Sequence, residues 1–487
     1  MSFASKIRKK ARIFLSLYVL SLLSLFSSCL FAKTVYAAPD WGAPASITAG
    51  AAIVMDADSG AILYGRNINE QHYPASITKI MTALLVLENC SLDETVTFSQ
   101  TAVSNLEPGA VTAFTSAGDQ LTVRDCLYAL LFRSANEVAN ALAEHVSGSV
   151  EAFAALMNER ARELGCLNTH FVNPNGLSST EHVTTAYDMA LIARACMDNK
   201  KFLEIESTDT YKMAGTKLRP NGLTLTIGHK MLRSGTPYSD ERVVGGKTGF
   251  TTASGNTLVT MAEDGGRRLV VVCLQDKTPA HYTDTKAMLD YGFSHFENMD
   301  GDSFLTKKQM EERLIADTIV PAEGSNSLRT DRTFVATVPK GAAPTDLTVR
   351  YNYNLPDSAP ESAVAQLELR YGDHTAGSFY LLNDRESILN IENISTPTKV
   401  AIGVSAVAVA GGIAAFFLLG GGTAWHMHNV RVERIKLQRA KRRRRRRLES
   451  MGISEEEFGC MVAAYQEKHD KRRGASNGRK SGPRNRT

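Results

Sequence analysis

The feature that most restricts how this chain can fold is an uncharged apolar run at residues 400–419. A helix of that length spans the hydrocarbon core of a bilayer, which is about 30 Å thick. Lysines and arginines follow closely, including the unbroken basic run 441–447, and basic residues beside a span set the cytoplasmic side. A buried core helix is the alternative. The basic flank favours a transmembrane helix at 397–422 and a basic cytoplasmic tail at 423–487.

The N-terminal residues have the pattern of an export signal. The first 37 residues hold six basic residues and no acidic one, with an apolar run at 13–31 and then Val35-Tyr36-Ala37. This pattern predicts a secretory signal peptide at 1–37, and an uncleaved signal anchor is the alternative. The long middle of the chain is therefore expected outside the cytoplasm.

Charge is distributed unevenly. The whole chain carries +4, yet basic residues dominate the signal and the tail, so the part between them must be acidic. An acidic exterior domain is a poor nucleic-acid binder, and a nuclear interpretation of the arginine run conflicts with the export signal. We expect no nucleic-acid partner. The run is more simply a stop-transfer signal and an anchor for anionic lipids, which makes the membrane a partner through the helix and the tail.

Cysteine usage gives no framework for disulfides or metal. Cys29 lies in the signal and Cys460 in the tail. The other five are dispersed and form no C-x-x-C motif: Cys90, Cys126, Cys166, Cys196 and Cys273. An odd, scattered set predicts buried thiols, with no metal site and no bridges.

The periodicity of the middle region predicts an α+β fold. Short apolar runs flank turns at 58–60 and 264–266, so we expect hairpins from 51–55 with 61–64 and from 257–261 with 268–274. Helical spacing occupies 76–88, 123–146, 150–164, 184–197 and 283–296. Strands at both ends with helices between predict one antiparallel sheet covered by helices. This unit is placed at 38–298. A charged connector and a small β domain, with alternation over 333–391, follow at 299–396.

Three short strings of residues contain side chains that are typical of catalytic sites. In the first, Ser76 and Lys79 open a helical run after Pro74, a residue favoured in the first helical turn. A serine at a helix N-terminus lies near free N–H groups that stabilise an oxyanion. Lys79 lies on the same helix face and can be its base if burial or a nearby cation lowers the pKa. The alternative is a capping serine followed by a solvated lysine.

The second string, Ser134-Ala135-Asn136, lies next to apolar residues. Because Ser and Asn are poor in helix interiors, the string predicts a polar face toward a cleft, or else a cap at a helix junction. The third string, 247–249, reads Lys-Thr-Gly and follows two further glycines before a predicted strand. Glycines permit close approach, and a lysine beside a hydroxyl suits a terminal carboxylate. A lysine on a surface strand is the alternative.

In order, the strings read S-x-x-K, S-x-N and K-T-G. Residues 51–296 resemble the low-molecular-mass penicillin-binding proteins that are serine-type D-Ala-D-Ala carboxypeptidases. Similar signatures are FVNPNGL at 171–177, HVTTAYD at 182–188, and 284–286 leading to 291–293. The resemblance implies an α+β, β-lactamase/transpeptidase-like catalytic domain, an antiparallel sheet with helices. A small all-β domain and one C-terminal transmembrane helix would follow.

The resemblance also implies roles. Ser76 would be the acylated nucleophile, Lys79 its base, and Ser134 a proton relay. The substrate-binding residues would be Asn136, Lys247, Thr248, Gly249 and Phe250, with the N–H groups of Ser76 and Phe250 forming the oxyanion hole. The reaction would remove the terminal D-Ala from peptidoglycan stem pentapeptides by acyl-enzyme formation and hydrolysis, without metal or cofactor. β-Lactams would bind covalently.

The chain departs from the family pattern in two places. Phe250 stands where some relatives carry histidine, and a spanning segment with a basic tail replaces the amphipathic anchor helix that is common in the family. Two other functions share these features. A β-lactamase has the same strings, but 134–247 holds no convincing E-x-x-x-N for a deacylating water. A membrane-bound β-lactam or cell-wall sensor would fit the tail, although the tail shows no effector domain.

Overall fold

The computed structural model describes residues 39–317 except 45, 105 and 108, and residues 328–383 except 357, 358 and 361. The predicted signal peptide, transmembrane helix and cytoplasmic tail therefore lie outside the described residues. Within the described ranges, no helix is both long and apolar enough to cross a bilayer.

A five-stranded antiparallel sheet forms the centre of the first domain, in the order β2-β1-β9-β8-β7. Its strands are β1 (Ala51–Asp56), β2 (Ile62–Arg66), β7 (Val243–Thr251), β8 (Gly255–Asp264) and β9 (Arg267–Asp276). Both predicted hairpins are confirmed, and β1 pairs with β9 so that the two sequence ends of the domain share one sheet. The K-T-G string was expected to precede a strand. It lies inside β7, the edge strand.

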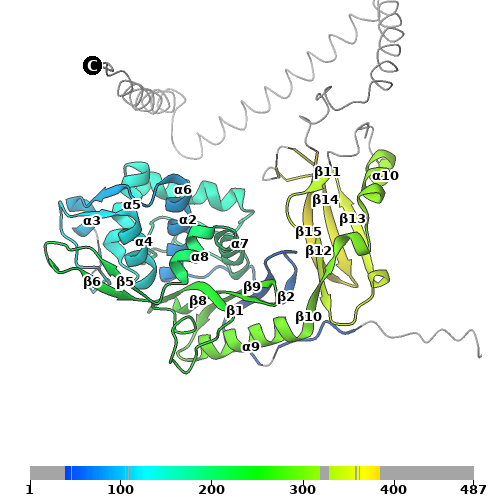
Figure 1. Ribbon diagram of the computed structural model, residues 1–487, viewed down its shortest axis with the longest axis horizontal. Helices are drawn as coiled ribbons and strands as arrows, with labels where there is room; N and C mark the ends of the chain where they lie inside the picture. The colour runs from blue at the N-terminus through cyan, green and yellow to red at the C-terminus, as the bar shows by residue number, and fades with distance from the viewer. Residues whose placement is uncertain are drawn as a thin grey trace, which may run out of the picture. The chain divides into compact units, whose positions relative to one another are not determined.

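Both faces of this sheet are buried, which explains the uninterrupted apolar run in β9. Val270 and Val272 join one hydrophobic cluster with the larger group of helices, whereas Leu269 and Val271 join a second cluster. Successive side chains of a strand point to opposite faces, so a strand between two layers must be apolar throughout. Figure 1 shows the two layers, with α7 (Ala186–Met197) on one side of the sheet and α9 (Ala280–His295) on the other.

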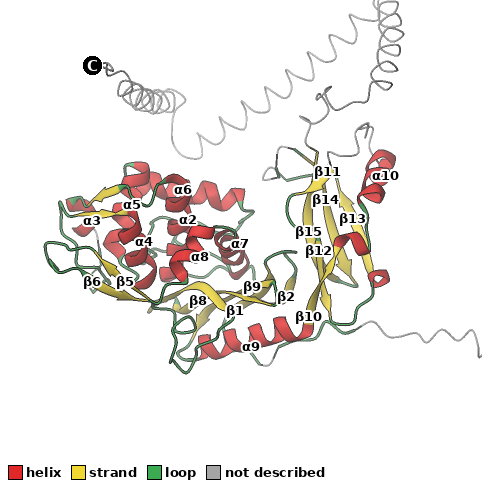
Figure 2. Cartoon of the chain, in the orientation of Figure 1, coloured by secondary structure: helices red, strands yellow, loops and turns green. Residues whose placement is uncertain are grey.

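The remaining helices of this domain pack together on the α7 side (Figure 2). They are η1 (Ala75–Thr78), α2 (Lys79–Asn89), α3 (Gln100–Ser104), α4 (Val123–Phe132), α5 (Asn136–Ser147), α6 (Val150–Glu163) and α8 (Lys200–Glu206). The single helix expected over 123–146 is wrong. The chain breaks between α4 and α5, where Ser134 adopts a left-handed φ of 61°, a conformation that ends helices because it is strained for any residue with a Cβ.

Two small ribbons that the sequence did not predict flank the helices: β3 (Thr95–Thr97) with β4 (Gln120–Thr122), and β5 (Thr210–Met213) with β6 (Leu223–Thr226). The described residues from 296 to 383, called the β domain below, are mainly strands. The elements of the β domain are β10 (Phe296–Asp300), η2 (Gly301–Ser303), α10 (Lys307–Asp317), β11 (Leu328–Thr330), β12 (Val335–Pro339), η3 (Pro344–Asp346), β13 (Leu347–Asn352), β14 (Ala363–Tyr371) and β15 (His374–Asn383). Helix α10 lies in the stretch predicted to be a connector.

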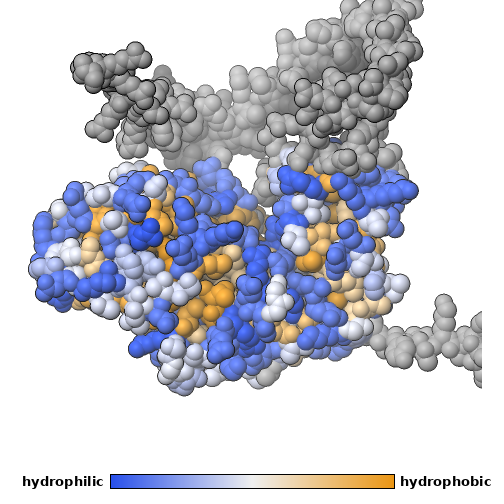
Figure 3. All heavy atoms as spheres, viewed as in Figure 1, coloured by the Kyte–Doolittle hydropathy of each residue, from blue (hydrophilic) through white to orange (hydrophobic). Residues whose placement is uncertain are grey.

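The surface of the described region is mostly hydrophilic, with smaller apolar areas (Figure 3). Two of the exposed large apolar side chains flank the strings singled out above. Tyr73, 37% exposed, precedes the first string, and Phe250, 66% exposed, follows the third. Neither residue contributes to a core, so both are free to contact a ligand.

Candidate active site

The first string lies where a short 3-10 turn meets a helix. Pro74 precedes η1, which contains Ser76, and α2 begins at Lys79. The Ser76 side chain is half-buried, whereas Lys79 is fully buried at 0% exposure. A solvated lysine is therefore excluded. The serine is accessible and its lysine neighbour is not, which is the arrangement required of a nucleophile with a desolvated base.

Three acceptors surround the Lys79 ammonium. Its Nζ lies 3.1 Å from Ser76 Oγ and 2.8 Å from Asn136 Oδ1, and it also donates to the backbone oxygen of Asn175. Burial lowers the pKa of Lys79 well below its usual value, the nearby Lys247 charge lowers it further, and Glu137 opposes the shift. Neutral lysine has two N–H groups and one lone pair. With both N–H groups directed to Asn136 and Asn175, the lone pair faces Ser76 and can accept its proton.

The second string forms the junction between α4 and α5. Asn136 begins α5 and, besides accepting from Lys79, donates from Nδ2 to the Val111 oxygen at 3.0 Å. Ser134 Oγ is buried and has no hydrogen-bond partner among the described residues. A buried hydroxyl without a partner is costly, and an active site is one place where such a group is retained. The string lies at a helix junction, but the N-cap position of α5 is Ala135 and no side chain caps this helix. Asn136 instead supplies a polar group to Lys79.

The third string lies on the edge strand β7. Lys247 is 4% exposed and its Nζ donates to the Thr248 oxygen at 2.8 Å. Burial lowers the pKa of Lys247 to about 8, against the attraction of Glu206. Burial in turn raises the pKa of Glu206 to about 8, opposed by its bond from the Gly246 N–H and by Lys247. Thr248 is half-buried and Phe250 is exposed. The two side chains lie on the same face of β7, because residues two apart on a strand point to the same side.

Gly249 permits the first and third strings to touch. A Cβ at this position would lie 2.4 Å from Thr257 Oγ1 and 2.9 Å from the Ser76 nitrogen. Thr257 Oγ1 in turn donates to the Pro74 oxygen at 2.8 Å. The backbone nitrogen of Ser76 therefore adjoins the Gly249–Phe250 segment, which is the proximity that two N–H groups need to bind one oxyanion.

A buried histidine, not among the expected site residues, fixes the turn that carries the nucleophile. The Val172 N–H donates to His182 Nδ1 at 3.0 Å, so the ring hydrogen is on Nε2 and donates to Thr78 Oγ1 at 2.9 Å. The Thr78 hydroxyl then donates to the Ala75 oxygen at 2.8 Å. Burial lowers the pKa of His182 to about 3, and the charges of His170 and Lys79 add to the shift, so the ring remains neutral at physiological pH.

This chain of hydrogen bonds ends on a strained residue. Ala75 has a φ of 52°, which costs on the order of 1 kcal/mol or more for a residue with a Cβ. Gly176 allows the loop to approach, because a Cβ there would lie 1.9 Å from the Ala75 oxygen. The segment 171–188 appeared in the sequence only as a signature. Its structural role depends on contacts across 104 residues that no local pattern reveals.

A pocket of about 280 Å³ opens beside the nucleophilic turn. Its lining includes Tyr73, Ala75, Leu177, His182 and Thr251, and most of these side chains are apolar or carry only a hydroxyl. The region therefore has the buried Lys247 on β7 and a largely apolar hollow on the side of the 176–182 loop.

The fold and this arrangement, an accessible serine beside a fully buried lysine, are those of a serine acyl-transfer enzyme. Comparison with known proteins agrees. The profile of the D-alanyl-D-alanine carboxypeptidase family, peptidase family S11, matches residues 37–278. D-alanyl-D-alanine carboxypeptidase DacF of Bacillus subtilis is 32% identical over 275 residues, covering 55% of this chain and 68% of that protein. DacC of Escherichia coli is 34% identical over 283 residues, covering 55% of this chain and 67% of that protein.

A solved structure extends the similarity beyond the first domain. Penicillin binding protein 6B from Escherichia coli matches with a TM-score of 0.53 and 26% identity, covering 72% of this chain and 100% of that one. Residues 39–300 make up a smaller fraction of this chain than the 72% that the match covers. The match therefore extends into the β domain. The chain belongs to the D-alanyl-D-alanine carboxypeptidase family and is a serine peptidase with the penicillin-binding, transpeptidase-like α+β fold.

Proposed function

We propose that this chain removes the terminal D-Ala from peptidoglycan stem pentapeptides through an acyl-enzyme on Ser76, and that penicillin acylates the same serine. The observation that carries the proposal is the contact of 3.1 Å between Ser76 Oγ and the fully buried Lys79 Nζ. Membership of the carboxypeptidase family supports the substrate class.

In the first step Lys79 accepts the Ser76 proton as Oγ attacks the carbonyl carbon of the penultimate D-Ala. The developing oxyanion takes hydrogen bonds from the N–H groups of Ser76 and Phe250. The tetrahedral intermediate collapses when the amine of the leaving D-Ala receives a proton, for which the Ser134 hydroxyl is the relay. Water then hydrolyses the ester, and Lys79 again serves as base, so the enzyme is regenerated.

The remaining groups orient the substrate. Lys247 supplies a positive charge and Thr248 a hydroxyl for the terminal carboxylate, the features a charge-assisted hydrogen bond requires. Asn136 has a second N–H on Nδ2 for a substrate carbonyl. The pocket beside Ala75 takes the stem on the acyl side of the scissile bond. Phe250 contributes its backbone N–H, and its exposed ring lies at the rim.

We further propose that residues 400–419 span the membrane, with the catalytic domain outside the cytoplasm and the basic tail inside. The absence of charge in this run and the basic residues after it support the topology. Peptidoglycan stems lie on the same outer side, so the substrate and the export signal require the same orientation.

Ser76→Ala tests the chemistry. The purified variant should neither release D-Ala from a D-Ala-D-Ala peptide nor form a covalent adduct with fluorescent penicillin, while its thermal unfolding stays close to that of the wild type. Undiminished labelling of the variant would overturn the assignment. The wild type also separates the alternatives, since a β-lactamase would turn over only β-lactams and a sensor neither compound.

A further inference from the structure

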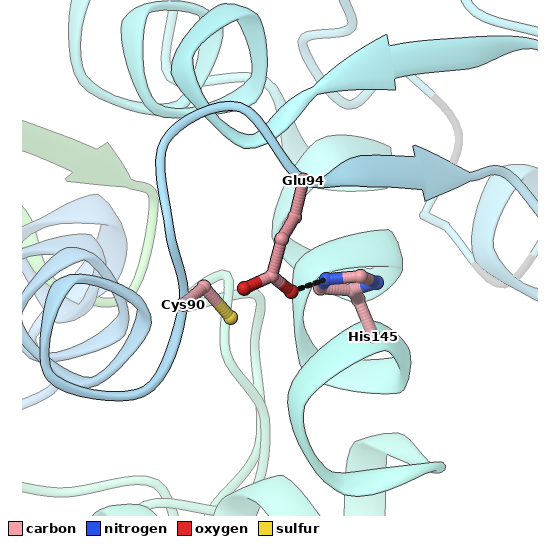
Figure 4. Close-up of side chains that lie close together, drawn as sticks. All are labelled: Cys90, Glu94 and His145. Carbon is pink, nitrogen blue, oxygen red and sulfur yellow. Dashed lines mark hydrogen bonds and ion pairs between the residues drawn. The ribbon is translucent and has the colours of Figure 1, made fainter. Parts of the chain in front are cut away.

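A second cluster of chemically active side chains lies at the other ends of α2 and α5. Cys90 caps the end of α2, Glu94 follows it in the next turn, and His145 lies in the last turn of α5. Their sulfur, oxygen and nitrogen atoms all lie within 4.8 Å of one another. In the part of the chain that the structure describes, no other three Cys, His, Asp or Glu side chains gather so closely. Figure 4 shows the three side chains converging.

We propose that Cys90, Glu94 and His145 bind one divalent zinc-type ion, with water as the fourth ligand. Thiolate, imidazole and carboxylate are the ligands that zinc prefers. Tetrahedral bonds of about 2.0–2.1 Å to nitrogen and oxygen place those two atoms about 3.3 Å apart. Glu94 Oε2 and His145 Nε2 are already separated by 3.1 Å, so the ion can replace the shared hydrogen with little movement of either side chain.

The backbone around the cluster is fixed before any ion binds. The Cys90 N–H donates to the Val86 oxygen at 2.9 Å, and the Glu94 N–H donates to the Ser91 oxygen at 3.2 Å. The Ser91 N–H donates to Glu94 Oε1 at 2.8 Å, which leaves Oε2 directed at the histidine. Hydrogen bonds of this kind to the second oxygen of a carboxylate orient metal ligands and raise affinity.

The charges also favour a cation. The Glu94 carboxylate, which is already paired with His145, attracts a divalent ion. Binding breaks the S–H bond and forms a sulfur–metal bond, so the thiol proton passes to solvent and no oxidant or reductant is needed. A divalent ion with one thiolate and one carboxylate leaves the site neutral.

The ion would tie together the two helices that build the active site from their opposite ends. Helix α2 begins at Lys79 and α5 begins at Asn136, and these two side chains meet at 2.8 Å. The role of the ion is therefore structural. The inference does not depend on the proposed function, because none of the three ligands contacts the nucleophile or its base.

The test uses the full-length chain, purified in detergent, stripped with a chelator and titrated with Cd²⁺ or Zn²⁺. We expect one ion per chain, a thiolate-to-cadmium charge-transfer band, and a midpoint of thermal unfolding raised by about 5–10 °C at a hundredfold excess over the dissociation constant. Cys90→Ser should abolish the band. Glu94→Gln and His145→Gln should weaken binding at least tenfold, and D-Ala release should be unchanged in all three variants.

His170→Gln and Asp93→Asn are the matched controls. The first removes an exposed histidine and the second an exposed acid next to the cluster, and both should bind Cd²⁺ as the wild type does. The proposal is overturned if the wild type shows neither the band nor a thermal shift at millimolar metal, or if the band survives in Cys90→Ser. Should Cys90→Ser unfold, unchanged Cd²⁺ affinity in both glutamine variants overturns it equally.

Discussion

Ser76 and Lys79 are held in place by residues that the proposed mechanism does not place at the bonds being made or broken. Two oxygen acceptors, from Asn136 and Asn175, occupy the N–H groups of neutral Lys79 and leave its lone pair to Ser76. His182 and Thr78 hold the Ala75 oxygen and with it the strained peptide that precedes the nucleophile. Preorganised polar groups of this kind avoid reorganisation during the reaction.

Thr78→Val and Thr78→Ser separate this positioning role from simple packing. Valine has the shape of threonine without the hydroxyl, so both the His182 bond and the Ala75 bond are lost. Losing a buried hydrogen bond costs about 1–3 kcal/mol, and we expect the rate of acylation by penicillin and kcat for D-Ala release to fall about tenfold. KM should change little, because Thr78 lies behind the turn.

Serine keeps the hydroxyl, so Thr78→Ser should retain most of kcat. His182→Gln should lower kcat as the valine variant does, and combining it with Thr78→Val should add little, because the two residues act through one chain of bonds. Equal losses in the serine and valine variants would show that the methyl group matters, rather than the hydrogen bond.

Lys247 should make catalysis pH-dependent in a substrate-specific way. Burial lowers the pKa of Lys247 to about 8, so its charge is present below that pH and is lost as the pH rises through it. We expect kcat/KM for peptides with a free terminal carboxylate to fall above about pH 8, because kcat/KM reports the free enzyme. A substrate with an amidated C-terminus lacks the partner charge and should show no such decline.

Lys247→Ala should lower kcat/KM for the carboxylate substrate about ten- to a hundredfold, as expected when a charge-assisted hydrogen bond of about 1.5–3 kcal/mol is removed. The amidated substrate should lose far less. Steady-state kinetics on both peptides measure the difference, and an equal loss on both would place Lys247 in proton transfer instead.

At the scale of elements, the site depends on the contact between η1 and β7. The 3-10 turn packs against β7 at Gly249, where the glycine has no side chain to separate the two backbones. Among the described residues, β7 is the edge strand of this sheet, so one side of its backbone is not paired with another strand. The distance between the turn and the strand then determines whether the Ser76 and Phe250 N–H groups can share one oxygen.

Gly249→Ala should therefore abolish acylation and destabilise the fold. The added Cβ meets Thr257 Oγ1 at 2.4 Å and backbone atoms of η1, and overpacking of this kind costs about 1–3 kcal/mol. Gly245→Ala is the control in the same strand, because its Cβ would meet neighbours at 3.5 Å, an ordinary contact. Penicillin labelling and thermal unfolding of the two variants should differ. Similar behaviour in both would show that the close approach is not required.

Local patterns predicted the elements whose periodicity is long, and missed those set by single residues or distant contacts. The hairpins β1–β2 and β8–β9 are confirmed because short apolar runs and turn residues coincide there. The break at Ser134 was expected only as the alternative interpretation of the second string, because helical spacing of apolar residues continues through it. The strands β3 to β6 hold three or four residues each, too few for alternation to appear. Likewise, nothing near His182 in the sequence points to Thr78.

At the scale of the whole molecule, the two described domains are held together by polar contacts as well as by a shared core. Thr337 Oγ1 lies 2.6 Å from Ser59 Oγ, in the turn after β1, and the Ser378 N–H donates to the Ser59 oxygen at 3.0 Å. One hydrophobic cluster includes residues of α9 and of β12 and β15. The β domain therefore connects the enzyme to the segment that leads toward residues 400–419.

If 400–419 spans the bilayer with its basic flank inside, removing it should free the enzyme. A chain ending at Thr396 should be released into the medium or periplasm, bind penicillin and cleave D-Ala at the wild-type rate, because the residues of the site lie between Tyr73 and Thr257. Protease added outside cells whose membrane is intact and exposed should remove the catalytic domain of the full-length protein. An epitope placed after Arg447 should survive, since the arginine run holds that side in the cytoplasm. Cleavage of the epitope from outside would reverse the topology. Retention of the shortened chain at the membrane would instead assign the anchor to an uncleaved N-terminal segment or to the β domain.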